Sequence, residues 1–240
     1  MYVRASLAFL LIFVIGGGVL LLADTRELGD SYPDVAPQTT SAVPPTTTTP
    51  ATAIPPTSLA LNIADIPLSG SGEFLPASSF GPQVGDGEII EYSVAVEEGI
   101  GLDPDVVAEF VDEVLGDRRS WIAEGTTGFR RIESGGLFTV VVATPDTVDQ
   151  LCRPLTTNGN YSCARNGWVA INLVRWLTAT DTWTAELALY RQYVVNHEVG
   201  HYLGRPHLDC PNAGALAPVM MQQTKGLDSC VENGWPYPNG

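Results

Sequence analysis

All three histidines of this 240-residue chain fall within one stretch of eleven residues, at positions 197, 201 and 207. Residues four apart on a helix point the same way, so His197 and His201 present two imidazoles to one point. Val194 continues this stripe backwards by three residues, which predicts that the face packs inward. The pattern therefore predicts a helix over about residues 183–203 with a polar centre inside the fold.

The chain must turn sharply after this helix to bring the third histidine back. Gly204 can adopt the left-handed conformation that ends many helices, and the following Arg205-Pro206 pair forces extended backbone. Both features direct His207 towards the first two histidines. Three histidines that meet in this way match the ligand set of a catalytic Zn²⁺ site, in which a water takes the fourth position.

Glu198 directly follows the first histidine, and this offset suits a general base better than a metal ligand. In that role it takes a proton from a water activated by the metal and returns it to the leaving amine. A purely structural zinc site would have no need of this glutamate. A bare His-Glu-x-x-His arises by chance in large sequence sets, whereas the full eleven-residue spacing rarely does.

The segment from His197 to His207, HEVGHYLGRPH, resembles the His-Glu-x-x-His-x-x-Gly-x-x-His signature of metzincin metallopeptidases at every fixed position. The resemblance implies a zincin-like α+β domain, zinc as cofactor and a methionine beneath the ligands in a Met-turn. Met220 is the first candidate for that methionine and Met221 the second, although methionines also fill gaps in ordinary cores. Gln222 stands where some metzincins have a tyrosine that contacts the zinc or the oxyanion, so the oxyanion stabiliser is unassigned.

The stretch from Glu88 to Pro238 is also similar to an exported bacterial family of unknown function. The similarity includes the phrases YRQYVVNHE and QQTKGL. It implies a shared fold and site, and it implies nothing about the substrate.

Other elements are predicted from hydrophobic periodicity and from capping residues such as Asp103-Pro104. They are a strand at 88–96, a helix from 103 to near 116, a strand at 137–143, a short helix at 145–151 and a strand at 168–176. Together they predict an α+β fold in which a mixed, twisted sheet packs against two main helices, with the active-site helix followed by the Met-turn. Either of the last two strands could form the sheet edge that pairs with an extended substrate, unless both are interior strands.

The first quarter of the chain does not look globular. Residues 7–23 are seventeen nearly uninterrupted apolar residues after Arg4, which is typical of a membrane segment with its N-terminus inside. A cleaved signal peptide is the competing interpretation, but the exit Leu21-Leu22-Ala23 lacks the small-x-small pattern. Both interpretations export everything that follows.

A spacer follows the apolar segment, because residues 39–58 hold eight Thr and five Pro and cannot bury a core. Such a sequence favours a semi-rigid polyproline II stalk, either bare or O-glycosylated. We therefore expect a cytoplasmic N-terminus at 1–6, a transmembrane signal-anchor at 7–23, a disordered Pro/Thr-rich stalk at 24–65 and a catalytic domain at 66–240.

Export would place the four cysteines in an oxidising space, where disulfides persist. Loop-closure entropy favours local partners, so we expect Cys152 to pair with Cys163 and Cys210 with Cys230. Free thiols or a cysteine-bound metal fit less well, because no pair has the short Cys-x-x-Cys spacing of zinc ribbons. With all four paired, no cysteine is left to hold the zinc in a latent state.

The net charge of −15 disfavours nucleic acid as a partner, because phosphates need a basic surface. The patterns together predict a membrane-tethered, extracytoplasmic zinc metallopeptidase that acts on peptides or proteins, or a secreted one if the signal is cleaved. Two other functions stay open. One is a hydrolase of peptide cross-links in cell-wall polymer, and the other is a zinc-holding binding module, against which Glu198 argues. No pattern predicts an oligomeric state.

Overall fold

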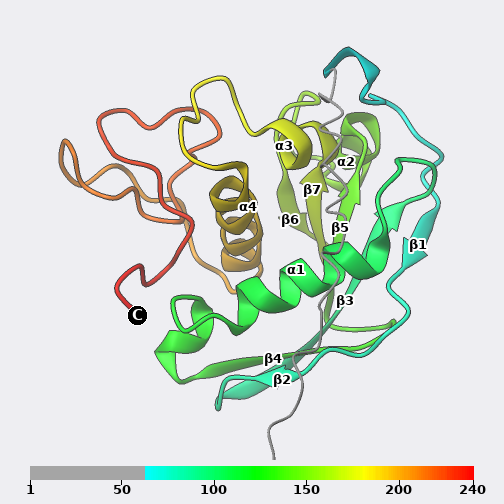
Figure 1. Cartoon of the computed structure of the whole chain (residues 1–240), viewed down its shortest axis with the longest axis horizontal. Coiled ribbons are helices and arrows are strands. Elements are labelled where there is room, and N and C mark those ends of the chain that lie inside the picture. The colour runs from blue at the N-terminus through cyan, green and yellow to red at the C-terminus, as the bar shows by residue number, and fades with distance from the viewer. Residues whose placement is uncertain (1–62) are drawn as a thin grey trace, which may run out of the picture. The chain divides into compact units, whose positions relative to one another are not determined.

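The computed structural model describes residues 63–240 (Figure 1). The predicted cytoplasmic N-terminus, membrane anchor and nearly all of the stalk lie outside the described residues. Between residues 63 and 240 no helix combines the length and the apolar character needed to cross a membrane. In chain order the elements are η1 (Ile63–Asp65), β1 (Phe74–Pro76), β2 (Gln83–Val84), β3 (Glu88–Glu97), α1 (Pro104–Gly116), η2 (Trp121–Glu124), β4 (Thr127–Arg131), β5 (Phe138–Ala143), α2 (Pro145–Leu151), β6 (Cys163–Arg165), β7 (Trp168–Asn172), α3 (Leu173–Thr178) and α4 (Leu187–Tyr202).

The seven strands form one mixed sheet in the order β2-β4-β3-β5-β7-β6, with β1 also paired to β3. Strands β4, β3, β5 and β7 run parallel, whereas β1, β2 and β6 are antiparallel to their neighbours. The β3–β5 register runs from Tyr92 opposite Phe138 to Val96 opposite Val142. The prediction of an α+β fold with a mixed sheet is confirmed.

Alternate residues of each strand point to opposite sides of the sheet, so each face has its own set of buried side chains. Different helices cover the two faces. One face packs with α1 and α4 into the main core, and Figure 1 shows these two helices as the largest of the fold. The buried strand residues on that face are Tyr92, Val94, Val96, Phe129, Phe138, Val140, Val142, Val169 and Ile171. The opposite face carries Ala95, Val141 and Ala170, which pack with Val148 of α2 and with the Cys152–Cys163 disulfide.

Helix α1 forms where its capping residues predict it. The side chain of Asp103 accepts a hydrogen bond from the backbone N–H of Asp105 at 2.9 Å, and Pro104 takes the first helical position. The buried residues of α1 then recur at helical spacing and face the sheet: Val107, Ala108, Val111, Val114 and Leu115. The predicted short helix at 145–151 is confirmed as α2.

Two predicted boundaries were wrong. The strand expected over 168–176 ends at Asn172, because the Asn172 side chain accepts hydrogen bonds from the N–H groups of Val174 at 3.0 Å and Arg175 at 3.4 Å and so caps α3. Helix α4 begins at Leu187 and not near residue 183. A short apolar run does not by itself distinguish a strand from a helix, so a cap residue inside the run was missed.

The sheet topology decides between the alternatives left open for the substrate-pairing edge. Both candidate edges, the strands now identified as β5 and β7, lie inside the sheet. The edge is β6, a strand of three residues that is antiparallel to β7. Its brevity leaves too little alternation for a sequence pattern to reveal it.

Both predicted disulfides are present, Cys152–Cys163 and Cys210–Cys230. They account for every cysteine of the sequence, so no thiol is left over among the described residues. Cys163 belongs to β6, and the first disulfide therefore ties the edge strand to the end of α2.

A buried carboxylate joins the segment before β1 to the end of the sheet. Glu97 is 1% exposed, and it accepts hydrogen bonds from the N–H groups of Gly72 at 2.8 Å and Thr144 at 2.7 Å. The hydroxyls of Thr144 and Thr147 donate at 2.8 Å and 2.7 Å. Desolvation alone would raise the pKa of Glu97, but these hydrogen bonds outweigh it and hold that pKa below its ordinary value.

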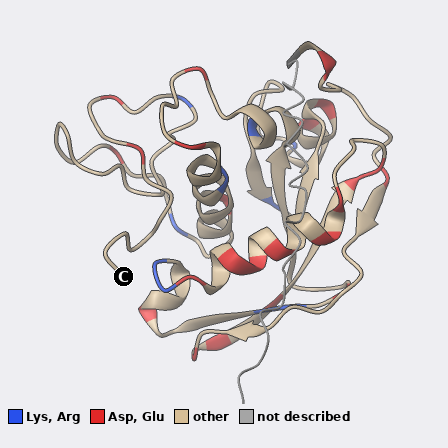
Figure 2. Cartoon of the chain, in the orientation of Figure 1, with Lys and Arg blue, Asp and Glu red and all other residues tan. Residues whose placement is uncertain are grey.

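Acidic residues dominate the described surface. Figure 2 shows several of them along α1, while Lys and Arg are few. Four arginines are paired with carboxylates: Arg119 with Asp117, Arg130 with Glu91, Arg131 with Asp112 and Arg205 with Glu124.

Candidate metal centre

The first two histidines lie on helix α4, and one ring nitrogen of each is hydrogen-bonded to a main-chain carbonyl. Nδ1 of His197 lies 2.8 Å from the carbonyl oxygen of Val219, and Nδ1 of His201 lies 3.0 Å from that of Arg205. A carbonyl can only accept, so each Nδ1 carries the proton. Each Nε2 then carries a lone pair and no proton, which is the tautomer and support that metal-binding histidines use.

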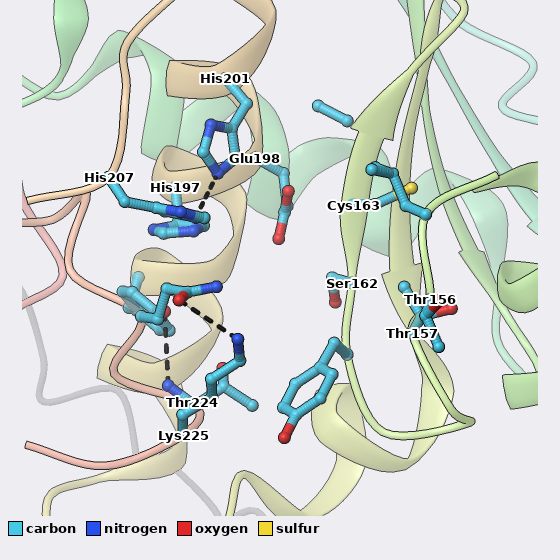
Figure 3. Close-up of a pocket in the computed structure, with 15 residues that line it drawn as sticks. Thr156, Thr157, Ser162, Cys163, His197, Glu198, His201, His207, Thr224 and Lys225 are labelled. Atoms are coloured by element: carbon cyan, nitrogen blue, oxygen red, sulfur yellow. Dashed lines mark hydrogen bonds between the residues drawn. The ribbon is translucent and has the colours of Figure 1, made fainter. Parts of the chain in front are cut away.

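The turn after α4 delivers the third histidine as predicted. Gly204 has a φ of 78°, and its N–H donates to the carbonyl of His201 at 2.9 Å. The chain then reverses, and Nε2 of His207 comes to lie 2.9 Å from Nε2 of His201. One ring nitrogen from each of the three histidines lies within 4.8 Å of the others, an arrangement that could hold a metal ion (Figure 3).

The protonation state of the rings also suits a cation. Burial lowers the pKa of His197 to about 3 and also lowers the pKa of His201. The pKa of His207 is lowered by burial and then by the charges of His201 and Lys225. Metal ligands must be deprotonated, and three neutral imidazoles are a common ligand set for Zn²⁺. The residues therefore fit the ion that the sequence predicts.

Glu198 lies in the same cleft as the histidines and is 5% exposed. Its Oε2 is buried without a hydrogen-bond partner in the described part of the chain. Burial raises the pKa of Glu198 to about 8. A buried polar atom without a partner is costly, and at a cavity wall it indicates a site for a bound ligand or water.

The predicted Met-turn passes beneath α4. The N–H of Met221 donates to the carbonyl of Pro218 at 2.9 Å, which makes the turn, and the Val219 carbonyl between them supports His197. A Cβ added to Gly200 would lie 2.6 Å from the Trp121 ring and closer still to Met220 Sδ. Met220 is therefore the methionine that packs directly against α4 at Gly200.

Met221 packs elsewhere, in a small cluster with Ala217 and Cys230. This separation distinguishes the two methionines that the sequence left as first and second candidates. The Cys210–Cys230 disulfide lies beside the same cluster and constrains the segment that carries both.

Two tyrosines on α4 hold the next part of this segment, a role that the sequence pattern did not predict. The hydroxyl of Tyr193 donates to the carbonyl of Met221 at 3.1 Å, and the N–H of Thr224 donates to that hydroxyl at 3.4 Å. The hydroxyl of Tyr190 lies 2.9 Å from Thr224 Oγ1. The backbone near Thr224 is therefore fixed against the helix.

The histidines and Glu198 open into a cleft of about 470 Å³. Its volume is in the range of small-molecule and peptide sites. Figure 3 shows α4 on one side and, on the other, the strand and loop that carry Ser162, Cys163 and Thr156. The other residues that line the cleft are Leu155, Thr157, Tyr161, Ala164, Tyr193, Gln222, Thr224 and Lys225.

A second group of contacts holds the turn that follows α4. Both carboxylate oxygens of Glu124 accept hydrogen bonds from Arg205, at 2.5 Å and 2.6 Å, and the hydroxyl of Tyr237 donates to Glu124 at 2.6 Å. Since the carbonyl of Arg205 supports His201, these contacts help to orient a candidate ligand.

Comparison with curated proteins and with solved structures gives no match. A family model described as "Protein of unknown function (DUF3152)" matches residues 62–238. This range includes every described strand, both disulfides and the whole histidine cluster. The chain therefore belongs to the DUF3152 family of proteins of unknown function.

Proposed function

We propose that this chain is a zinc-dependent hydrolase that cleaves peptide bonds. One observation carries the proposal: three histidine nitrogens converge in a cleft that also holds a buried carboxylate with an oxygen that has no partner in residues 63–240. A purely structural metal site has no use for that carboxylate or for an open cleft.

The arrangement around the site supports a zincin-like fold of the metzincin kind. An active-site helix beside a mixed sheet, a glycine turn, a third histidine and a buried methionine under the helix occur here in the order that the metzincin resemblance implies. The edge strand β6, which lies across the cleft from α4, is antiparallel to its neighbour and could pair with an extended peptide.

The chemistry divides between the metal and Glu198. Zinc held by His197, His201 and His207 would supply a Lewis acid for the scissile carbonyl and would lower the pKa of a water. Glu198 takes a proton from the attacking water while the water oxygen bonds to the carbonyl carbon. The carbon–nitrogen bond then breaks, and Glu198 passes the proton to the leaving nitrogen.

We place this activity outside the cytoplasmic membrane. The two disulfides support an oxidising compartment, and the apolar segment at 7–23 would keep the domain at the membrane or direct its secretion.

The test uses the full chain with its disulfides formed. We expect about one zinc per chain in both the parent and Glu198→Gln, and cleavage of a peptide library by the parent alone. Removing a general base should reduce the rate by about 10²- to 10⁴-fold. Glu186→Gln, the same change on the residue that precedes α4, is the matched control and should cleave like the parent.

Cell-wall preparations form a second arm of the same experiment. Fragments released from wall polymer but not from peptides or proteins would replace the peptidase with a wall cross-link hydrolase. Zinc bound with no fragments from any substrate would contradict hydrolysis and favour a binding module.

A further inference from the structure

Lys225 is the only lysine among the 240 residues, and it lies in the wall of the cleft. It follows Thr224, whose backbone and hydroxyl are held by two tyrosines of α4. Figure 3 shows Thr224 and Lys225 at one end of the cleft, on the side of α4, with Ser162 and Thr157 across from them. A side chain on an anchored backbone can act as a fixed recognition element.

The charge of Lys225 is not neutralised within residues 63–240. Four arginines form salt bridges, but Lys225 takes part in none of the ion pairs of the described chain. Its ammonium donates one hydrogen bond, to Oε1 of Gln222 at 3.2 Å, and lies 5.2 Å from the centre of the Tyr161 ring. Glu198 is the one carboxylate among the described residues that line the cleft.

The surroundings of Lys225 are rich in further donors. An ammonium has three N–H groups, so two remain after the bond to Gln222. The Oγ of Ser162 accepts from the N–H of Asn172 at 3.1 Å, which leaves its hydroxyl hydrogen free to donate into the cleft. Gln222 uses its amide oxygen to accept from Lys225, and its amide nitrogen is a further hydrogen-bond donor.

The negative charge of the rest of the molecule makes the position of Lys225 selective for anionic groups. A chain with a net charge of −15 repels anions over most of its surface. The exposed ammonium of Lys225 has no salt-bridge partner among the described residues, and at the cleft wall it favours an anionic group of the substrate. A carboxylate that reaches it gains charge-assisted hydrogen bonds, which are stronger than those between neutral groups.

We propose that Lys225 determines specificity by binding a carboxylate of the substrate at its end of the cleft. The substrate is then a peptide with either an acidic side chain or a free chain-terminal carboxylate at that position. This inference rests on the proposed peptidase function. Its recognition step is nevertheless measurable without turnover.

The single lysine allows a direct binding measurement. Reductive methylation with ¹³C labels Lys225 and the terminal amine only, and the two signals differ in their titration with pH. The labelled protein is the full chain carrying Glu198→Gln, with and without zinc. The probes are acetylated peptides of equal length with Glu or Gln at each position, each with a free or an amidated C-terminus.

We expect the Lys225 signal to shift with peptides that carry a carboxylate and to stay in place with the neutral peptides. A shift with Glu in an amidated peptide identifies a side-chain carboxylate, and a shift with Gln and a free end identifies the chain terminus. No shift with any of these probes, or the same shift with neutral ones, would overturn the inference even if the parent cleaves peptides.

Kinetics provide the second arm. Lys225→Gln should lower kcat/KM for the preferred acidic substrate by about tenfold and leave its neutral counterpart unchanged, while Lys225→Arg keeps the preference. Arg118→Gln, which removes an exposed cation outside the cleft lining, should change neither value. An unchanged preference in Lys225→Gln contradicts the inference and leaves the peptidase intact. If the parent cleaves no peptide, the proposed function fails and the binding arm alone decides the role of Lys225.

Discussion

Gly200 lies where α4 packs tightly against Met220 and Trp121. An added Cβ would meet Met220 Sδ and the Trp121 ring at less than van der Waals distance. Alanine is ordinarily favoured over glycine inside a helix by about 1 kcal/mol. Here overpacking should reverse the sign, so that Gly200→Ala lowers the free energy of unfolding by roughly 1–3 kcal/mol. Urea denaturation would measure it.

The same substitution in a Met220→Ala background is the control for this contact. Removing the thioether relieves one of the two clashes, so the cost of Gly200→Ala should be smaller there. An alanine variant as stable as the parent would show that the helix does not rest on Met220 as described.

At the scale of single residues, the sequence revealed the candidate ligands and not their supports. Three histidines in eleven positions could be recognised because histidine occurs nowhere else in the chain. The carbonyls of Val219 and Arg205, which orient two of these histidines, could not be recognised in the sequence. Every residue has a carbonyl, and only the fold determines which carbonyl lies beside a histidine. Lys225 was visible in the composition as the sole lysine, but its place in the cleft depends on tertiary structure.

Among the secondary-structure elements, the end of β3 depends on a carboxylate that must stay ionised. The pKa of Glu97 is below its ordinary value, so its contribution to stability is present above the unfolded-state pKa of about 4.3 and is lost as the pH falls through the folded-state pKa. We expect Glu97→Gln to lower the unfolding free energy by about 1–3 kcal/mol at pH 7. The difference from the parent should shrink below about pH 4.

Chemical denaturation of both proteins between pH 3 and pH 8 would test this. Glu73→Gln, which alters an exposed glutamate in the same region, should leave stability unchanged at every pH. A constant difference between Glu97→Gln and the parent down to pH 3 would mean that ionisation of Glu97 does not contribute.

The helices and strands also show which local sequence signals are sufficient to predict where an element begins and ends. Helices α1 and α2 begin with proline at the first helical position, and their positions were predicted closely. The boundary between β7 and α3 was missed because Asn172 ends one element and caps the next. Strand β6 has only three residues, and its pairing with β7 and its disulfide, not its own sequence, define it.

At the scale of the whole molecule, the candidate metal site joins two parts of the chain, α4 and the segment after Gly204. A ligand that binds only the folded state stabilises it, by about 2.7 kcal/mol at a hundred times its Kd. For a domain of this size we expect zinc to raise Tm by roughly 5–10 °C, and a chelator to reverse the change. Calorimetry of the full chain would measure both.

His207→Ala separates binding from folding in this experiment. His207 is exposed, so its loss should leave the Tm of the zinc-free protein unchanged while removing most of the zinc-dependent increase. A full increase in Tm with this variant would place the bound zinc at other residues.

Of the two disulfides, only Cys152–Cys163 reaches the cleft, through Cys163 of β6, whereas Cys210–Cys230 packs beside Met221 outside the cleft lining. The β6 side of the cleft is therefore held by a covalent link, while the α4 side is held by packing and hydrogen bonds alone. Dithiothreitol added during purification would loosen the β6 side and would also compete for a bound metal as a thiolate. Because every cysteine of the chain is already paired, inhibition by such a reagent would report a loosened cleft or a lost metal and not a cysteine nucleophile.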